Sequence, residues 1–154
     1  MNIRELRLKD ILIDYQIEER EFEYGDVKGI AEIFGYQIVF FRKQDNLSDT
    51  VALSFNEIWE DDGLISLANY VLKYVDIDIM FGDKLSKIRN KYGKADFLDK
   101  LYTNMTGYSY LIDAKLFIVF WVKKGRLVGL EIIADKEMAN DIFNFRNGIE
   151  SMVH

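Results

Sequence analysis

The sequence predicts an α+β fold, a single globular domain over residues 1–154 with a mostly antiparallel sheet and helices packed mainly on one face. Two observations predict this class. Strand-like segments gather before residue 56 and again after residue 106, and two amphipathic helical segments lie between them. A last helical segment closes the chain, and this segregated order is typical of α+β domains. With 154 residues and 49% hydrophobic residues, the chain is long enough to bury a core.

The first third of the chain reads mainly as strands. Apolar residues before position 18 fit both helical spacing and strand alternation, and we expect a helix that passes into a strand near Glu18. Residues 20–43 follow as extended chain broken at Gly25, Gly29 and Gly35, with YQIVFF as the strongest strand. The segment TVALSF alternates as a further strand.

Three helices are predicted from apolar spacing and capping residues. The first covers residues 64–75, and Asp61 or Asp62 is positioned to cap it. The second begins at a predicted cap, Asp83, and ends at Gly93. The C-terminal helix follows a cap at Asp135 and has a predicted buried stripe, which consists of Met138, Ile142, Phe145 and Ile149.

A three-strand meander is predicted between the second helix and the last. GYSYLI ends at a tight turn, Asp113–Ala114, and KLFIVFWV follows as a continuously apolar strand of the kind that is covered on both faces. Gly125 supplies the next turn, because glycine accepts the positive φ that such turns require, and LVGLEII is the third strand.

Several classes of site are excluded by the residue types present. The chain has no cysteine, and its one histidine, His154, is the last residue, where we expect a mobile chain end. Ser-His-Asp and Cys-His catalysis and ordinary zinc sites are therefore absent, and no phosphate-binding glycine loop is found. We expect no cofactor, no bound metal and no catalytic residue. No apolar run approaches the roughly 20 residues of a membrane span, and a cysteine-free chain fits a cytoplasmic location.

Paired carboxylates are the remaining route to catalysis. In VDIDIM, Asp76 and Asp78 would project to one side of an extended segment, about 6–7 Å apart, which suits hydrolysis or a hard cation. The alternative is an exposed edge on which the aspartates alternate with buried Val75, Ile77 and Ile79, and the strict alternation favours it.

Aromatic residues offer a second type of site. Tyr102, Tyr108, Tyr110 and Trp121 would line a ligand pocket or an interface if they shared one sheet face. The alternative is that they are half-buried sheet residues, which the strand preference of aromatics favours.

Charge is unevenly distributed along the chain. Residues 1–82 hold 17 Asp/Glu and 8 Lys/Arg, a balance of −9, whereas residues 83–154 hold 9 and 12, a balance of +3, for a net charge of −6. The acidic half argues against nucleic-acid binding and would steer a basic partner. Two acidic stretches stand out, EEREFE and EIWEDD, whereas the outer side of the second helix is basic and reads as a solvated face.

The stretch MFGDKLSKIRNKYGKAD, followed by LFIVFWVKKGRLVGLEI and a closing helix, resembles a layout of small bacterial immunity proteins. The resemblance covers residues 80–146. It implies a non-enzymatic inhibitor that neutralises a cognate toxin, such as a basic nuclease, by direct contact, and it carries over no active residues.

Under this hypothesis the EIWEDD segment is the partner-binding hot spot. The ring of Trp59 would anchor the contact, while carboxylates steer and pair with the toxin; these are Glu57, Glu60, Asp61 and Asp62. The same aspartates also fit a plain helix start. The alternative functions are a small-ligand or stress-response binding domain that uses the aromatic sheet face, and a hydrolase that uses Asp76 and Asp78.

Overall fold

The computed structural model describes residues 14–24, 27–34, 38–43, 52–55 and 62–153 of the chain. The strands are β1 (Glu18–Tyr24), β2 (Val27–Phe34), β3 (Ile38–Lys43), β4 (Ala52–Phe55), β5 (Phe97–Asp99), β6 (Thr106–Ile112), β7 (Leu116–Lys123) and β8 (Arg126–Ile133). The helices are α2 (Asp62–Tyr74), α3 (Leu85–Tyr92) and α4 (Lys136–Val153).

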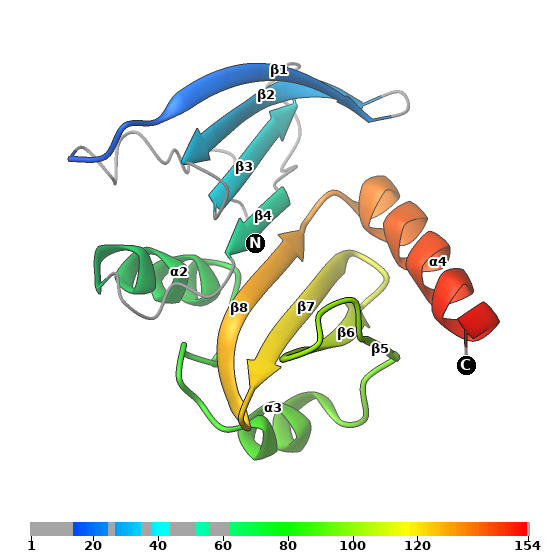
Figure 1. The fold of residues 1–154 in the computed structure, drawn as a ribbon. Helices are drawn as coiled ribbons and strands as arrows, with labels where there is room; N and C mark the ends of the chain where they lie inside the picture. Colours follow the sequence, from blue (N-terminus) through cyan, green and yellow to red (C-terminus); the bar gives the residue numbers. More distant parts are fainter. Residues whose placement is uncertain (1–13, 25–26, 35–37, 44–51, 56–61, 154) are drawn as a thin grey trace.

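All described strands join one antiparallel sheet in the order β1-β2-β3-β4-β8-β7-β6-β5 (Figure 1). The first four strands form one meander and the last four form another. The two meanders meet where β4 pairs with β8, from Ala52↔Ile133 to Phe55↔Leu130. The predicted α+β class with an antiparallel sheet is therefore confirmed, and β1 and β5 are the outer strands of the described sheet.

Strand β7 separates the two halves of the core, as its continuous apolar sequence predicts. Its residues are buried from Leu116 to Val122. Because successive side chains of a strand point to opposite faces, Ile118 and Phe120 join the cluster under α2 and α3, whereas Val119 and Trp121 join the cluster under α4. Two of the three described helices therefore lie on one face, and α4 covers the other.

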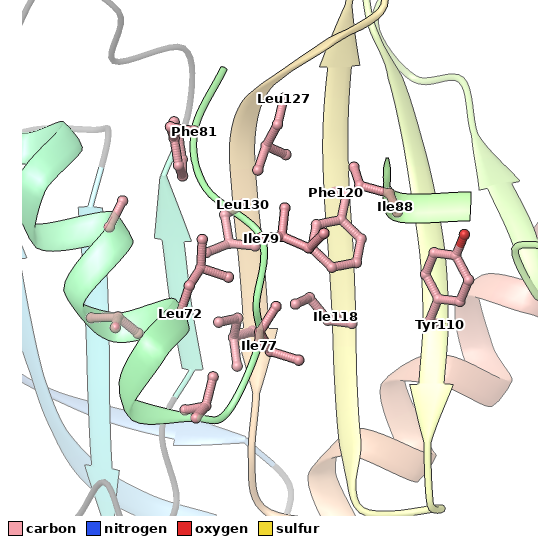
Figure 2. Packing of buried hydrophobic residues seen from close by; sticks show 14 of the residues in the cluster. Leu72, Ile77, Ile79, Phe81, Ile88, Tyr110, Ile118, Phe120, Leu127 and Leu130 are labelled. Carbon is pink, nitrogen blue, oxygen red and sulfur yellow. The ribbon is translucent and has the colours of Figure 1, made fainter. Parts of the chain in front are cut away.

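The chain between α2 and α3 is an extended segment that seals the α2–α3 face. Figure 2 shows Ile77 and Ile79 of this segment next to the sheet residues Ile118, Phe120 and Leu130, and Phe81 belongs to the same buried cluster. Their side chains are buried, and the backbone N–H of Phe81 donates to Asn69 Oδ1 of α2 at 2.9 Å. The segment thus holds α2 and the sheet together without being a strand itself.

Both predicted turns of the C-terminal meander are confirmed. Asp113 and Ala114 have φ of 53°, and Lys124 and Gly125 have φ of 50° and 76°. Two consecutive residues with positive φ are characteristic of the tight turns whose twist matches that of the flanking strands.

Helix α4 is fixed by its cap and by an ion pair. Asp135 caps it as predicted, since its carboxylate accepts the N–H of Met138 at 3.0 Å. Arg146 then donates two hydrogen bonds to the Glu131 carboxylate of β8, at 2.7 and 2.8 Å. Its guanidinium also lies 5.5 Å from the centre of the Phe117 ring. Such a partly buried bidentate pair fixes the orientation of the helix on the sheet.

Two local predictions are wrong. The chain is not broken at Gly29, which lies inside β2 and pairs with Phe22 on one side and Lys43 on the other. Asp83 does not cap α3, whose N-cap is Lys84, because the Asp83 carboxylate instead accepts the N–H of Met80 at 2.8 Å. Gly93, with φ of 77°, ends α3 as predicted.

The buried stripe predicted for α4 is correct only at its start. Met138 is buried and Ile142 packs on the core, but Phe145 and Ile149 are 68% and 44% exposed. Phe143 takes the inward position instead, and its ring lies 5.6 Å from that of Phe97. The helix thus presents a neighbouring row of residues to the sheet.

Gly107 allows Trp121 to lie flat against the sheet. The two residues are paired between β6 and β7, and the Trp121 side chain is buried. A Cβ atom at position 107 would meet Val119 Cγ1 at 2.8 Å and Trp121 Cζ3 at 2.9 Å. Glycine is therefore required here for space.

We expect Gly107→Ala to lower the free energy of unfolding by about 1–3 kcal/mol, because the added methyl group overpacks the core. Denaturant unfolding measures this change. The control is Gly148→Ala in α4, where the added Cβ meets no atom within 4 Å. There we expect a gain of about 0.5–1 kcal/mol from lower chain entropy. Equal stability of Gly107→Ala and the natural chain would contradict the packing argument.

Candidate functional site

The predicted hot spot lies mostly outside the described residues. Glu57, Trp59, Glu60 and Asp61 fall in the range 56–61. Asp62 is described, and it is the exposed first residue of α2, as expected for a carboxylate at a helix start. Of the five residues, the structure therefore places Asp62 alone.

The other acidic stretch forms the outermost strand of the described sheet. Strand β1 carries four exposed glutamates, which are Glu18, Glu19, Glu21 and Glu23. Glu18 accepts a hydrogen bond from Arg20 at 2.7 Å. Because side chains alternate along a strand, Glu19, Glu21 and Glu23 share one side of β1 and repeat about every 6–7 Å. The edge is therefore an acidic surface held in a defined spacing.

Asp76 and Asp78 alternate with buried neighbours, as the sequence indicates. Both aspartates are exposed, while Val75, Ile77 and Ile79 are buried. Both also line an open groove of about 640 Å³ between α2 and the extended segment. The same groove is lined by Lys73, so cation and carboxylates share it.

Asp76 has a clear role in ending α2. Its φ is 62°, its N–H donates to the Lys73 carbonyl at 3.1 Å, and the next N–H, that of Ile77, donates to the Leu72 carbonyl at 2.8 Å. This pair of bonds around a left-handed residue is a Schellman motif, which usually has glycine at the position of Asp76. Ile77 and Leu72 share the buried cluster, as the motif requires.

Asp78 is held as a carboxylate by α3. Lys91 Nζ lies 3.2 Å from Asp78 Oδ2. The hydrogen bond from Lys91, its positive charge and the charge of Lys87 lower the pKa of Asp78 below the ordinary 3.8. A general acid needs the opposite shift, so this pair links α3 to the extended segment and does not poise Asp78 to donate a proton.

The predicted aromatic pocket is not formed. Tyr110 is 4% exposed and packs with Phe120 on the α2–α3 face, where its hydroxyl donates to the Gly93 carbonyl at 2.9 Å. Trp121 lies on the opposite face, in contact with the half-exposed Tyr102 at 5.2 Å between ring centres. Only Tyr102 and Tyr108 line a common hollow. The rings are split because Tyr108 and Tyr110 point to one side of β6, whereas Trp121 of β7 is paired with Gly107, which points to the other side.

Burial raises the pKa of Tyr110 and the pKa of Tyr92. The Tyr92 ring stacks on Phe120, which belongs to the same buried cluster as Tyr110. Both hydroxyl groups therefore stay protonated at neutral pH. Their rings pack at the margin of the α2–α3 core, and the polar hydroxyl group of each ring lies at the outer end.

No group of three His, Cys, Asp or Glu side chains within the described ranges could hold a metal ion. In the same part of the chain, no helix combines the length and apolar character that a membrane crossing requires. Comparisons with protein-family models, with curated proteins and with solved structures find no match to this chain.

We expect Asp76→Gly to raise the free energy of unfolding by about 0.5–1 kcal/mol, because glycine adopts the left-handed conformation without steric cost. Asp78→Gly is the matched control. Its backbone is extended, so glycine at this position should lower the free energy of unfolding by a similar amount through chain entropy. The substitution also removes the ion pair with Lys91. Thermal or denaturant unfolding separates the two. A loss of stability in Asp76→Gly would contradict the assigned capping role.

We expect the Asp78 carboxyl to titrate below 3.8, and Lys91→Gln to raise its midpoint towards that value. Because the folded pKa is lowered, the pair stabilises the fold at pH above the unfolded pKa and is lost as pH falls through the folded pKa. Carboxyl chemical shifts in an NMR titration report the midpoint. Lys115→Gln, at an exposed site in the β6–β7 turn, should leave it unchanged.

Proposed function

We propose that this protein is a non-enzymatic binding protein, an immunity-type inhibitor that neutralises a cognate bacterial toxin by direct contact through an acidic surface. The observation that carries the proposal is the acidic edge strand β1, with its four exposed glutamates. The resemblance of residues 80–146 to immunity proteins supplies the functional class. The acidic segment 57–62 is proposed as part of the same contact.

Two physical properties make β1 a suitable contact surface. Its row of carboxylates raises the local negative potential, which accelerates encounter with a basic protein and orients it. It is also the outer strand of the described sheet, so one side of its backbone is not used by β2. Charged residues on an edge strand also oppose unwanted sheet extension, which makes the contact selective for a partner that carries compensating cations.

The negative charge of β1 indicates which surface of a toxin it would contact. A toxin that acts on nucleic acid needs a cationic site for phosphate groups, and a regular array of carboxylates competes for that site. Binding of this kind blocks the toxin without any reaction by the inhibitor. The affinity of the expected complex therefore falls as salt is added, because the contact surface of the inhibitor is rich in carboxylates.

Reversal of charge on β1 tests the proposal. The genes beside that of this protein are searched for a toxin, and binding of the purified candidate is measured by calorimetry at low salt. We expect Glu21→Lys/Glu23→Lys to weaken binding by about tenfold or more and to abolish protection of cells that express the toxin. A second variant, Glu60→Lys/Asp61→Lys/Asp62→Lys, tests the other acidic segment in the same assays.

Glu137→Lys/Asp141→Lys is the control for β1, because it makes the same change in net charge on exposed positions of α4. It should retain binding within about twofold, since exposed charges away from an interface contribute little. Unchanged binding in both acidic variants, or turnover of a substrate by the purified protein, would refute the proposed function.

A further inference from the structure

Two adjoining hollows on the α3 side of β6 are lined by cations. The larger, of about 600 Å³, contains Lys100 and Lys124, and the smaller, of about 370 Å³, contains Arg89 and Lys94. Tyr108 lines both hollows, which therefore adjoin at this residue. We name this feature the basic groove. The remaining polar side chains of its larger part are Tyr102, Thr103, Asn104 and Thr106.

The charge of the basic groove is opposite to that of the whole chain. Acidic residues outnumber basic ones by 26 to 20, but no Asp or Glu lines either hollow. Elsewhere on the same side, Lys87 pairs with Asp83 and Lys91 pairs with Asp78. Among the described residues, Lys94, Lys100 and Lys124 have no such ion pair. Like charges that share a hollow repel each other, and a bound anion relieves that repulsion.

Backbone contacts fix the walls of the basic groove. The Leu85 N–H at the start of α3 donates to the Gly125 carbonyl at 2.9 Å, which holds α3 against the turn that carries Lys124. At the other end of α3, the Tyr110 hydroxyl donates to the Gly93 carbonyl, next to Lys94. The Arg89 guanidinium lies 5.4 Å from the centre of the Tyr108 ring. These contacts hold the segments that carry the cations in place without a ligand.

We propose that the basic groove binds an extended acidic segment of a partner protein. One hollow carries Lys100 and Lys124 and the other carries Arg89 and Lys94, and an extended peptide, which presents carboxylates on one side about every 6–7 Å, can reach both pairs of cations. The groove also includes apolar residues, Leu85 and Leu98, that can receive aliphatic side chains. Thr and Asn side chains supply hydrogen bonds for a peptide backbone. This inference does not depend on the acidic surface of the proposed function.

A peptide fits the groove better than nucleic acid does. Single-stranded nucleic acid is normally held by free aromatic faces on which bases stack. Here Arg89 covers one face of Tyr108, and the Tyr102 ring is packed at 80° against Trp121.

Fluorescence anisotropy of a labelled octaglutamate peptide tests this proposal on the full chain at low salt. We expect binding to the natural chain and a loss of about tenfold or more in Lys100→Glu/Lys124→Glu, with a smaller loss in Lys100→Gln/Lys124→Gln. Lys94→Glu should weaken binding through the smaller hollow. The matched control is Lys115→Glu/Lys136→Glu, which makes the same charge change at exposed positions outside the groove and should bind within about twofold of the natural chain.

Competition distinguishes the other anions. Unlabelled octaglutamate should displace the probe at a lower concentration than inorganic pyrophosphate or an oligothymidylate of equal length. Tighter binding of the oligothymidylate, with the same dependence on Lys100 and Lys124, would overturn the proposal in favour of nucleic acid, and tighter binding of pyrophosphate would overturn it in favour of a small phosphate ligand. An equal loss of peptide affinity in Lys100→Glu/Lys124→Glu and in the control would also overturn it, provided that thermal unfolding shows both variants to be folded. None of these outcomes depends on toxin binding, so failure here leaves the β1 proposal standing.

Discussion

Seven consecutive side chains of β7 are buried, and a strand can be buried in this way only if separate layers cover its two faces. The rest of the molecule supplies those layers. On one face, α2, α3 and the extended segment around Ile77 and Ile79 cover Ile118 and Phe120. On the other face, α4 covers Phe117, Val119 and Trp121, and the Phe97 side chain of β5 joins the same cluster. A Schellman motif at Asp76 fixes the end of α2 in the first layer. The Arg146–Glu131 pair fixes α4 in the second layer.

This apolar centre determines where charge can be placed. Exposed carboxylates and cations lie at the edges of the sheet and on the outer sides of the helices, where some pair, as Lys91 does with Asp78, and others gather by sign. Strand β1 at one edge is acidic, whereas α3 and the β7–β8 turn, near the other edge, carry the basic groove. The β1 glutamates and the basic groove are therefore separate surfaces of opposite charge.

Asp76 and Asp78 illustrate how one motif can combine two structural roles. Their alternation with isoleucines suggests a carboxylate pair, but each aspartate has a different function in the fold. Asp76 adopts the left-handed conformation that ends α2, and Asp78 pairs with Lys91 of α3. The extended segment between the helices thus depends on both residues, one through backbone conformation and the other through charge. Their common groove follows from this path of the chain.

The sequence by itself determined the elements whose signals are local. The burial of β7, the turns at Asp113 and Gly125, the cap at Asp135 and the alternation at Asp76 and Asp78 follow from hydrophobic periodicity and turn chemistry, and the structure confirms them. The antiparallel α+β class follows from the order of these elements. The acidity of the β1 stretch was also visible, but its position at the edge of the sheet was not.

Tertiary structure decided the features that depend on residues far apart in sequence. Helical spacing from Met138 and Ile142 favours Phe145 for the buried side of α4, but in the structure the Phe143 ring packs against Phe97 and Phe117 instead. Leu127 and Leu130 face the same layer because a bulge opposite Trp121 and Val122 shifts the register between β7 and β8. The basic groove joins Lys100, Lys124 and Arg89 from three elements. Such sites arise from strand pairing and helix docking, and no local pattern of residues encodes either.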